Sequence, residues 1–270
     1  MSEFSAHSNS NIESDFYPVV DSSSGAASGG AQGAPDAEAV QALFNRIAPV
    51  YDELNDRLSF GLHRVWKQMT VSWCQPFDGA IALDICCGSG DLARLLAKQV
   101  GASGEVTGLD FARSQLDWAR QNTQPLSSVA PITWVEGDAT DLPFDDQQFD
   151  AITMGYGLRN VPNIPKSLQE IHRVLKPGAK AAILDFHRPS SSIVQTLQHL
   201  YLERFVVPAA RQLGVESEYA YIWPSLQRFP TGRQQIRLAL DVGFHSAVHY
   251  EIAGGIMGVL VVQTDLASVY

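Results

Sequence analysis

Residues 81–93, Ile-Ala-Leu-Asp-Ile-Cys-Cys-Gly-Ser-Gly-Asp-Leu-Ala, decide the fold of this 270-residue chain. Five mostly apolar residues, typical of a buried strand, run into a loop with two glycines, and a helical pattern follows at about 90–100. Glycine permits a tight turn and lets the backbone approach a ligand closely. The stretch therefore predicts a strand, a ligand-binding loop and a helix, which together form the first unit of an α/β fold.

The same alternation continues toward the C-terminus. Further strands are predicted at 105–110, 132–137, 149–154, 180–186, 246–252 and 257–263. Helices are predicted at about 113–123, 164–175, 191–213 and 231–242, and an earlier one at 38–48 is ended by Pro49. Apolar strands that alternate with helices predict a parallel sheet with helices on both faces. Because the last two strands follow each other without a helix, one of them is expected to be antiparallel.

Four acids gather around the glycine loop. They are Asp84 before the loop, Asp91 in the first turn of the helix, Asp110 at the end of the second strand and Asp138 after the third. A pyrophosphate favours a helix N-terminus free of acids, although the helix dipole alone accounts for one carboxylate in a first turn. Converging acids favour a cation, and S-adenosylmethionine carries a sulfonium and an ammonium without a phosphate. Two alternatives stay open: residues 88–93 also satisfy the G-x-G-x-x-G/A pattern of an NAD-linked oxidoreductase, and the acids can be solvated around a simple turn.

In the S-adenosylmethionine interpretation, each part of the cofactor has an expected neighbour. Asp110, twenty residues after Gly90, is placed to accept both ribose hydroxyls. Asp138, in Gly137-Asp138-Ala139, is placed to accept the adenine amino group. The glycine loop passes close to the methionine part. The predicted cofactor-binding residues are Asp84, Gly88, Ser89, Gly90, Asp110, Asp138, Ala139 and Gly155.

Five segments carry a resemblance to a known family. They are FNRIAPVYDELNDRLSFGLHRVWK (44–67), LDICCGSGDLA (83–93), EGDATDLPF (136–144), GYGLRNV (155–161) and HRVLKPGAKAAILDFHRP (172–189). The chain resembles the ubiquinone/menaquinone biosynthesis C-methyltransferases over about 38–265, most of all the demethylphylloquinone and demethylmenaquinone branch of oxygenic phototrophs. Gly155 stands where the ubiquinone branch tends to have Ser, which removes a side-chain contact to the cofactor.

The resemblance implies both a fold and an activity. It implies a Rossmann-like class I methyltransferase with a seven-stranded, mostly parallel sheet whose last strand is antiparallel. The implied reaction is C-methylation of a 1,4-naphthoquinol that carries a phytyl or prenyl tail, and the acceptor must be reduced because a quinone ring is a poor nucleophile. A benzoquinol acceptor, a small-molecule O-methyltransferase and a non-catalytic cofactor-binding module remain as alternatives.

Catalytic candidates follow the fourth strand. Arg159 and Asn160 lie at the sheet edge where open α/β proteins bind their substrates. Arg159 is a permanent cation, so it is assigned to favouring the phenolate, with a salt bridge to a neighbouring acid as the alternative. Asn160 can orient the same oxygen or the cofactor. Tyr51 is expected to close over the cofactor, with ordinary packing as its alternative.

Substrate-binding candidates lie in the C-terminal half. In EYAYIWPSLQRFP (218–230), Tyr219, Tyr221 and Arg228 match the family signature and are expected to line the ring pocket. His187, after the fifth strand, is the candidate base, although an isolated His is more often structural. Apolar positions at helical spacing in 190–228 predict either core packing or a lid that admits the isoprenoid tail and rests on a membrane.

Composition bounds the remaining possibilities. A net charge of −10 and an isoelectric point near 5.1 argue against nucleic-acid binding. Residues 1–45 hold six acids and no Lys or Arg, so we expect a disordered acidic tail at 1–37. The rest of the chain, 38–270, is expected to form one methyltransferase domain, with a helical cap at 38–75 and a lid at 190–228. The tail fits neither a secretory signal nor a transit peptide, which predicts a cytoplasmic protein at the membrane of its quinol. No metal site is predicted, and a homodimer is left open.

Overall fold

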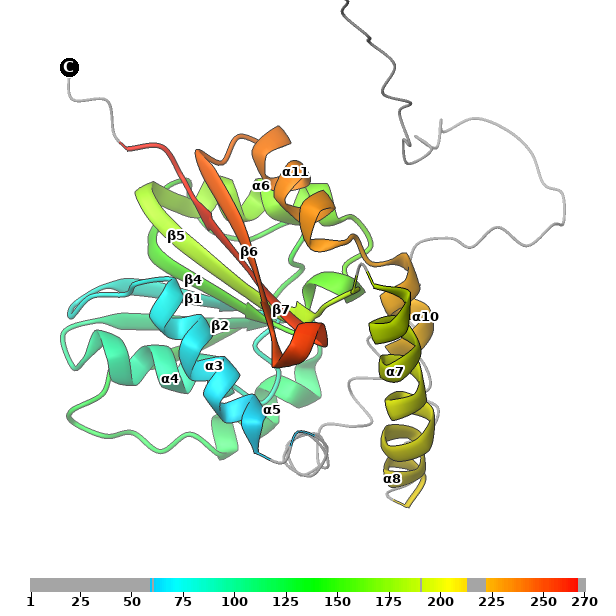
Figure 1. The fold of residues 1–270 in the computed structure, drawn as a ribbon. Helices are drawn as coiled ribbons and strands as arrows, with labels where there is room; N and C mark the ends of the chain where they lie inside the picture. Colours follow the sequence, from blue (N-terminus) through cyan, green and yellow to red (C-terminus); the bar gives the residue numbers. More distant parts are fainter. Residues whose placement is uncertain (1–58, 60, 190, 213–221, 267–270) are drawn as a thin grey trace, which may run out of the picture. The chain divides into compact units, whose positions relative to one another are not determined.

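A seven-stranded sheet forms the centre of the molecule (Figure 1). The computed structural model describes residues 59, 61–189, 191–212 and 222–266. Its strands are β1 (Ile81–Ile85), β2 (Glu105–Asp110), β3 (Ile132–Glu136), β4 (Phe149–Gly155), β5 (Leu175–Phe186), β6 (Ser246–Ile252) and β7 (Met257–Gln263). The acidic tail expected at 1–37 and the helix expected at 38–48 lie outside the described residues.

The strand order is β3-β2-β1-β4-β5-β7-β6. Strands β1 to β5 pair in parallel, and β7 runs antiparallel to both β5 and β6. The predicted seven-stranded sheet with one reversed, final strand is therefore confirmed. The order also reverses direction between β1 and β4, and α/β proteins bind ligands beyond the carboxyl ends of the strands at such a switch point.

Helices cover both faces of the sheet. They are α3 (Leu62–Trp73), α4 (Asp91–Val100), α5 (Arg113–Gln121), α6 (Ile164–Val174), α7 (Ser192–Tyr201), α8 (Val207–Gln212), α10 (Ile222–Arg228) and α11 (Gly232–Asp241). Side chains of α3 and α4 pack on one face, and those of α6 and α11 pack on the other. Predicted helices and observed helices agree within one or two residues for α4, α5, α6 and α11.

Alternation along the central strands divides the core into two layers. On β1, Leu83 and Ile85 face α6 and α11, whereas Ala82 faces α3 and α4. On β5, Ala181 and Ile183 belong to the first layer and Ala182 to the second. Because both faces are covered, the buried parts of these strands are mostly apolar instead of alternating with polar residues.

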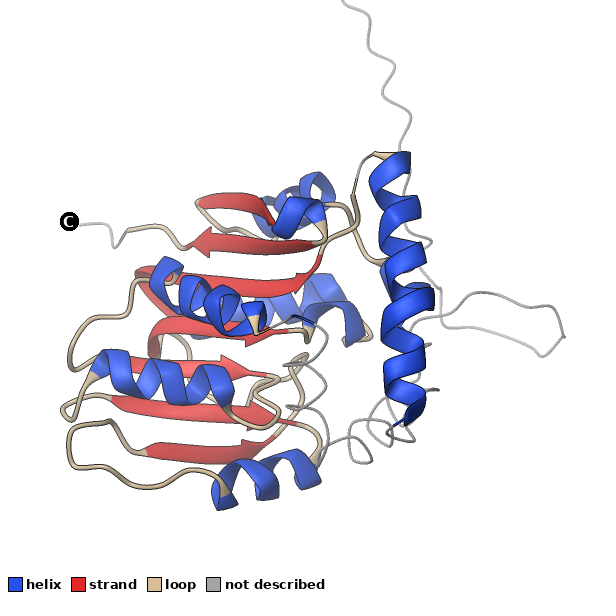
Figure 2. Cartoon of the chain, turned by 60° about the horizontal axis from the view of Figure 1, so that its bottom comes forward, coloured by secondary structure: helices blue, strands red, loops and turns tan. Residues whose placement is uncertain are grey.

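Two elements differ from the prediction by more than two residues. Strand β5 begins at Leu175 instead of residue 180, because the chain pairs with β4, bulges out through Gly178 (φ 77°) and then rejoins the ladder at Lys180. The helix predicted at 191–213 consists of α7, a π-helical turn (Leu202–Val206) and α8 in succession. Figure 2 shows this rod standing beyond the carboxyl ends of the parallel strands. Among the described residues, no helix combines the length and apolar character needed to cross a membrane.

Candidate active site

The loop between β1 and α4 is shaped by residues with positive φ. Cys86 (φ 54°), Gly88 (φ 53°) and Gly90 (φ 89°) turn the chain sharply. A Cβ atom on Gly90 would lie 2.5 Å from the ring of Trp134, so this position has room for glycine alone. The loop is tied to β2, because the Cys87 N–H donates to the Leu109 carbonyl over 3.0 Å. The backbone of the loop therefore forms a fixed wall.

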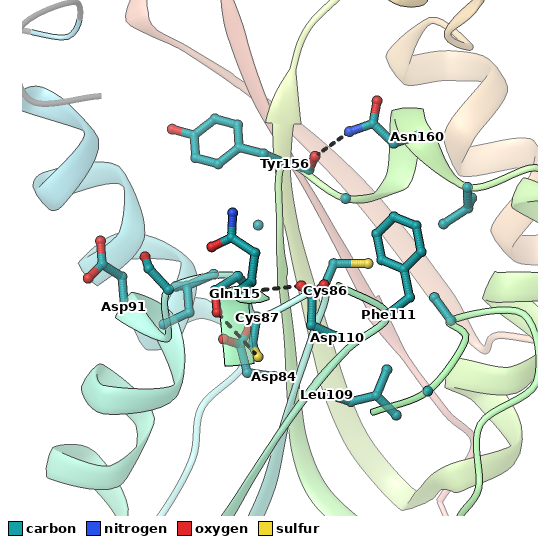
Figure 3. Close-up of a pocket in the computed structure, with 18 of the residues that line it drawn as sticks. Asp84, Cys86, Cys87, Asp91, Leu109, Asp110, Phe111, Gln115, Tyr156 and Asn160 are labelled. Atoms are coloured by element: carbon teal, nitrogen blue, oxygen red, sulfur yellow. Dashed lines mark hydrogen bonds between the residues drawn. The ribbon is translucent and has the colours of Figure 1, made fainter. Parts of the chain in front are cut away.

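A cleft of about 1040 Å³, including space open to solvent, lies above this loop (Figure 3). The residues that line it are Lys67, Asp84, Cys86, Cys87, Gly88, Ser89, Asp91, Leu92, Leu109, Asp110, Phe111, Gln115, Gly137, Asp138, Ala139, Gly155, Tyr156, Gly157, Asn160, Val161 and Pro162. Seven of the eight predicted cofactor-binding residues are among them, and so is Asn160; Gly90 lies in the same loop but does not line the cleft. The structure therefore brings predicted site residues together at one edge of the sheet, although Asp84 and Asn160 lie 76 positions apart in the sequence.

Asp110 braces the loop from the end of β2. Its Oδ2 accepts a hydrogen bond from the Gly88 N–H at 2.8 Å, and its Oδ1 accepts one from the Ala112 N–H at 2.8 Å. Burial raises the pKa of Asp110 to about 6, even though these backbone N–H groups favour the ionised form. The carboxylate is 5% exposed, so little water reaches it.

Asp84 lies beneath the same loop and is fully buried. Its Oδ1 accepts a hydrogen bond from the Thr153 hydroxyl at 2.8 Å, and its Oδ2 has no hydrogen-bond partner among the described residues. Burial raises the pKa of Asp84 to about 7, which the Thr153 hydroxyl, the Ala93 N–H and the charge of Lys67 counteract only in part. A buried carboxylate oxygen without a partner, at the floor of a cleft, is suited to a cationic ligand.

Asp91 is held by two cations at the start of α4. Lys67 of α3 approaches its Oδ2 at 2.6 Å, and Arg94 approaches its Oδ1 at 2.5 Å. Burial opposes the ionisation of Asp91, but the two cations outweigh burial, so its pKa lies below the ordinary value. Lys67 is the single basic side chain among the described residues that line the cleft, against four acids. The cleft is therefore negative and fits a cation better than a diphosphate.

The third strand and the fourth complete the cleft. Asp138 is exposed, and its Oδ1 accepts a hydrogen bond from the Thr140 N–H at 2.7 Å, which fixes the turn beside Ala139. At Gly155 a Cβ atom would lie 2.7 Å from the Leu92 side chain. The backbone of Gly155 therefore borders the cleft where a larger residue would displace α4.

The turn Leu158–Asn160, labelled η1, presents the two catalytic candidates differently. Asn160 lines the cleft, and its Nδ2 donates to the Tyr156 carbonyl at 3.0 Å (Figure 3). The Arg159 side chain is turned away from the cleft lining and forms an ion pair with Asp185 at 2.5 Å. The salt bridge that the sequence left open for Arg159 is thus present in the structure.

The other substrate candidates are outside the cleft or outside the described residues. Three of them lie outside the described residues: Tyr51, Tyr219 and Tyr221. Arg228 is exposed at the end of α10 and does not line the cleft. His187 is 1% exposed, lies 4.9 Å from the His249 ring between centroids, and does not line the cleft either; burial lowers its pKa.

Several cleft residues were not singled out from the sequence. Lys67 lies in the conspicuous SFGLHRVWK segment, but nothing in that segment shows that its ammonium reaches Asp91. Phe111 directly follows Asp110, and its aromatic character at a strand end was the available signal. Gln115 and Tyr156 also line the cleft without having been singled out.

Comparisons with solved structures define the fold. The chain superposes on the methyltransferase bound to the Trm112 methyltransferase activator of Haloferax volcanii with a TM-score of 0.60 at 18% identity, covering 82% of this chain and 97% of that one. A SAM-dependent methyltransferase from Aquifex aeolicus gives a TM-score of 0.55 at 18% identity, covering 73% and 88%. At such identities the likeness establishes the fold, which is that of the SAM-dependent methyltransferases.

The family follows from the sequence comparisons. The model of the ubiE/COQ5 methyltransferase family matches residues 32–263, and the chain belongs to this family. A relative from Nostoc punctiforme, named 2-phytyl-1,4-naphtoquinone methyltransferase, is 62% identical over 83% of this chain and 97% of its own length. The Arabidopsis thaliana chloroplastic 2-phytyl-1,4-beta-naphthoquinone methyltransferase is 52% identical over 81% and 85%.

Proposed function

We propose that this methyltransferase transfers a methyl group from S-adenosylmethionine to a ring carbon of 2-phytyl-1,4-naphthoquinol. The observation that carries the proposal is the 62% identity to the Nostoc punctiforme relative over 97% of that relative's length. At this level of identity over nearly the whole domain, the same substrate class is the simplest expectation. The acid-lined cleft supports the cofactor part of the proposal independently.

The residues of the cleft fit S-adenosylmethionine part by part. When bound, this cofactor supplies an electrophilic methyl on a positively charged sulfur. Asp110 at the end of β2 would hold the ribose hydroxyls, and Asp138 would accept from the adenine amino group. The unpartnered Oδ2 of Asp84 lies at the floor of the cleft and would stabilise positive charge there.

A dinucleotide fits the same cleft less well. The N-terminus of α4, where a pyrophosphate would bind, carries Asp91 in its first turn. Both cations next to Asp91 are already paired with it. We therefore expect S-adenosylmethionine and S-adenosylhomocysteine to raise the melting temperature and NAD to leave it unchanged.

The acceptor ring is proposed to face the η1 turn. Asn160 borders the cleft opposite Asp84 and Asp110 in the view of Figure 3. Because Asp185 already balances the charge of Arg159, we propose that Arg159 acts from behind Asn160 and not through direct contact with a phenolate. The walls of the cleft then align the ring carbon with the methyl group, and such alignment can supply up to about 7–11 kcal/mol.

The phytyl tail suggests how the enzyme meets its substrate. On α7, Ile193, Leu197 and Leu200 follow one another along one face and are 71%, 59% and 46% exposed. The opposite side of the same rod is buried through Leu202 and Val206. Since α7 contains no Asp, Glu, Lys or Arg and stands beyond the strand ends, we propose that its exposed face rests on the membrane that dissolves the tail.

A parallel incubation tests the substrate. The protein is incubated with methyl-labelled cofactor and, separately, with reduced demethylphylloquinone, a demethylmenaquinone and a demethylated benzoquinol. We expect label in the naphthoquinol with the phytyl tail, and a ring-methyl proton signal in its product. Label in the benzoquinol alone, or a methoxy signal, contradicts the proposal.

Vesicle sedimentation tests the membrane face. The triple variant Ile193→Ser/Leu197→Ser/Leu200→Ser should lose binding to phospholipid vesicles. Leu240→Ser, on α11 and 45% exposed, is the matched control and should bind as the wild type does. If the triple variant binds vesicles normally but changes its oligomeric state, the face contacts a second copy of the chain and the membrane proposal is wrong.

A further inference from the structure

We propose that Asp185 is a positioning residue that fixes Asn160 so that its amide oxygen accepts a hydrogen bond from a hydroxyl group of the reduced substrate. The inference rests on the proposed function and deepens it. It assigns to the η1 turn a means of distinguishing a quinol, which has a proton to donate, from a quinone, which has none.

Asp185, near the end of β5, holds the η1 turn by both of its oxygens. Oδ2 accepts a hydrogen bond from the Arg159 N–H at 3.1 Å, and Oδ1 accepts one from the Arg159 guanidinium at 2.5 Å. Oδ1 also accepts from the Phe186 N–H at 2.8 Å, which fixes the carboxylate itself. The backbone and the side chain of one residue in the turn are therefore both tied to β5.

The pair of Arg159 and Asp185 is buried. The two side chains are 8% and 4% exposed, and the guanidinium carbon lies 5.1 Å from the centroid of the Phe186 ring. In so dry a place each charge needs the other, because an isolated buried charge is strongly unfavourable. The pair thus has one favourable geometry, which makes it a rigid support for the turn.

The support reaches Asn160 through Tyr156. The Tyr156 carbonyl accepts hydrogen bonds from the Arg159 Nη1 and from the Asn160 Nδ2, both at 3.0 Å. The Asn160 N–H donates to the Gly157 carbonyl at 2.9 Å. Since the amide nitrogen of Asn160 is committed to a carbonyl, the amide cannot rotate without losing that bond.

The amide oxygen of Asn160 is what remains for a ligand. It is buried and has no hydrogen-bond partner among the described residues, in a residue that lines the cleft. An amide oxygen only accepts hydrogen bonds, so it matches an O–H donor. A quinol hydroxyl satisfies it, whereas a quinone carbonyl would set two acceptors against each other. This arrangement selects the oxidation state in which the ring is nucleophilic.

The test compares Asp185→Asn with Asp150→Asn. Asp150, at the other end of the sheet, is a matched control because its carboxylate also accepts from a backbone N–H (Ile81, 3.0 Å) and from a cation (Lys176, 2.7 Å). We expect Asp185→Asn to lower kcat about 100-fold through misplacement of Asn160. The calorimetric affinity for S-adenosylhomocysteine should stay at the wild-type value, and Asp185→Glu should recover part of kcat. Asp150→Asn should keep the wild-type kcat.

A second readout does not depend on the quinol. In ¹⁵N-labelled protein, the side-chain amide of Asn160, assigned with Asn160→Ala, should exchange slowly in the wild type and in Asp150→Asn, and quickly in Asp185→Asn. If no quinol is methylated by the wild type, the proposed function fails while this measurement still reports on the positioning. Should Asp185→Asn not fold, Arg159→Leu/Asp185→Leu removes both charges together and is tested in the same way.

Two results would overturn the inference. One is an Asn160 amide that remains protected when Asp185 or the whole pair is replaced. The other is a parallel loss of kcat and of S-adenosylhomocysteine affinity, which would show that Asp185 supports the cofactor site. A wild-type kcat in an Asp185→Asn protein that is less stable would also overturn the inference. The pair of Arg159 and Asp185 would then contribute to stability alone.

Discussion

Replacement of Asp84 by Asn should stabilise the protein in a pH-dependent way, because a buried carboxylate without a ligand opposes folding. The carboxyl of Asp84 is fully buried, and burial raises its pKa from 3.8 to about 7. The unfolded chain therefore ionises this group at lower pH than the folded chain does. As pH rises between these two values, the free energy of unfolding falls, and above the higher value the loss is complete.

The magnitude follows from the two pKa values. A shift from 3.8 to about 7 corresponds to about 4 kcal/mol of lost stability at pH 8 and to roughly 2 kcal/mol at pH 5. Asn is isosteric, and its amide oxygen can still accept from the Thr153 hydroxyl. Any difference in packing is independent of pH. The stability of Asp84→Asn relative to the wild type should thus rise by about 2.5 kcal/mol from pH 5 to pH 8.

Urea unfolding followed by circular dichroism at pH 5, 6.5 and 8 measures this difference. Asp117→Asn, on α5 and with a half-exposed side chain, controls for the change in net charge and should show no such trend. At pH 8, Asp84→Asn should also bind S-adenosylmethionine more weakly in calorimetry, since the cation has lost its buried partner. A stability difference that stays constant with pH would refute the reasoning, whatever happens to binding.

Three further predictions concern the same cleft. Affinity for S-adenosylmethionine should rise between pH 5.5 and 8, because Asp110 (pKa about 6) and Asp84 (pKa about 7) lose their protons and attract the cation. Calorimetry in buffers of different ionisation enthalpy measures both the affinity and the protons released on binding. S-adenosylhomocysteine, whose sulfur is neutral, should show a weaker dependence on pH. Thr153→Val removes a hydrogen bond that favours the ionised form of Asp84, so cofactor affinity should fall at pH 7 and recover toward pH 9. A loss of affinity that is equal at both pH values would contradict this prediction. Gly157→Ala places a Cβ atom 2.6 Å from the Cys86 Cβ and should cost about 1–3 kcal/mol in urea unfolding, and Cys86→Gly in the same chain should restore most of that stability.

The sheet could be predicted from the sequence because its strands are short apolar runs between clear turns. The limits of β1, β2, β6 and β7 were predicted to the residue. The start of β5 was not, because Lys176-Pro177-Gly178 has the composition of a turn, and only pairing with β4 makes Leu175 part of the strand. The break between α7 and α8 was missed for a related reason, since a π-helical turn hardly changes a helical pattern of apolar residues.

The acids of the site could be predicted because a parallel sheet brings strand ends together. Asp84 and Asp110 needed only the assumption that the first two strands are neighbours, which the sheet order confirms. Asp185 was missed, although an acid in the apolar run Ile183–Phe186 is unusual in a buried strand. Its partner lies 26 residues earlier, and no local pattern shows that the two meet. Sequence shows which charges exist, and tertiary structure decides which of them are neutralised.

That distinction changes how the cleft should be understood. Counted from its lining residues, four acids and one lysine make it strongly negative, yet two of those acids, Asp84 and Asp110, have pKa values close to neutrality because burial disfavours their charged forms. The cleft without a ligand is therefore less negative than its composition, and a cation that enters it lowers both pKa values by stabilising the carboxylates. Binding of the cation is then coupled to the loss of protons from Asp84 and Asp110. The selectivity of the cleft for a cationic cofactor over a neutral analogue should therefore grow as pH rises through 6 to 7.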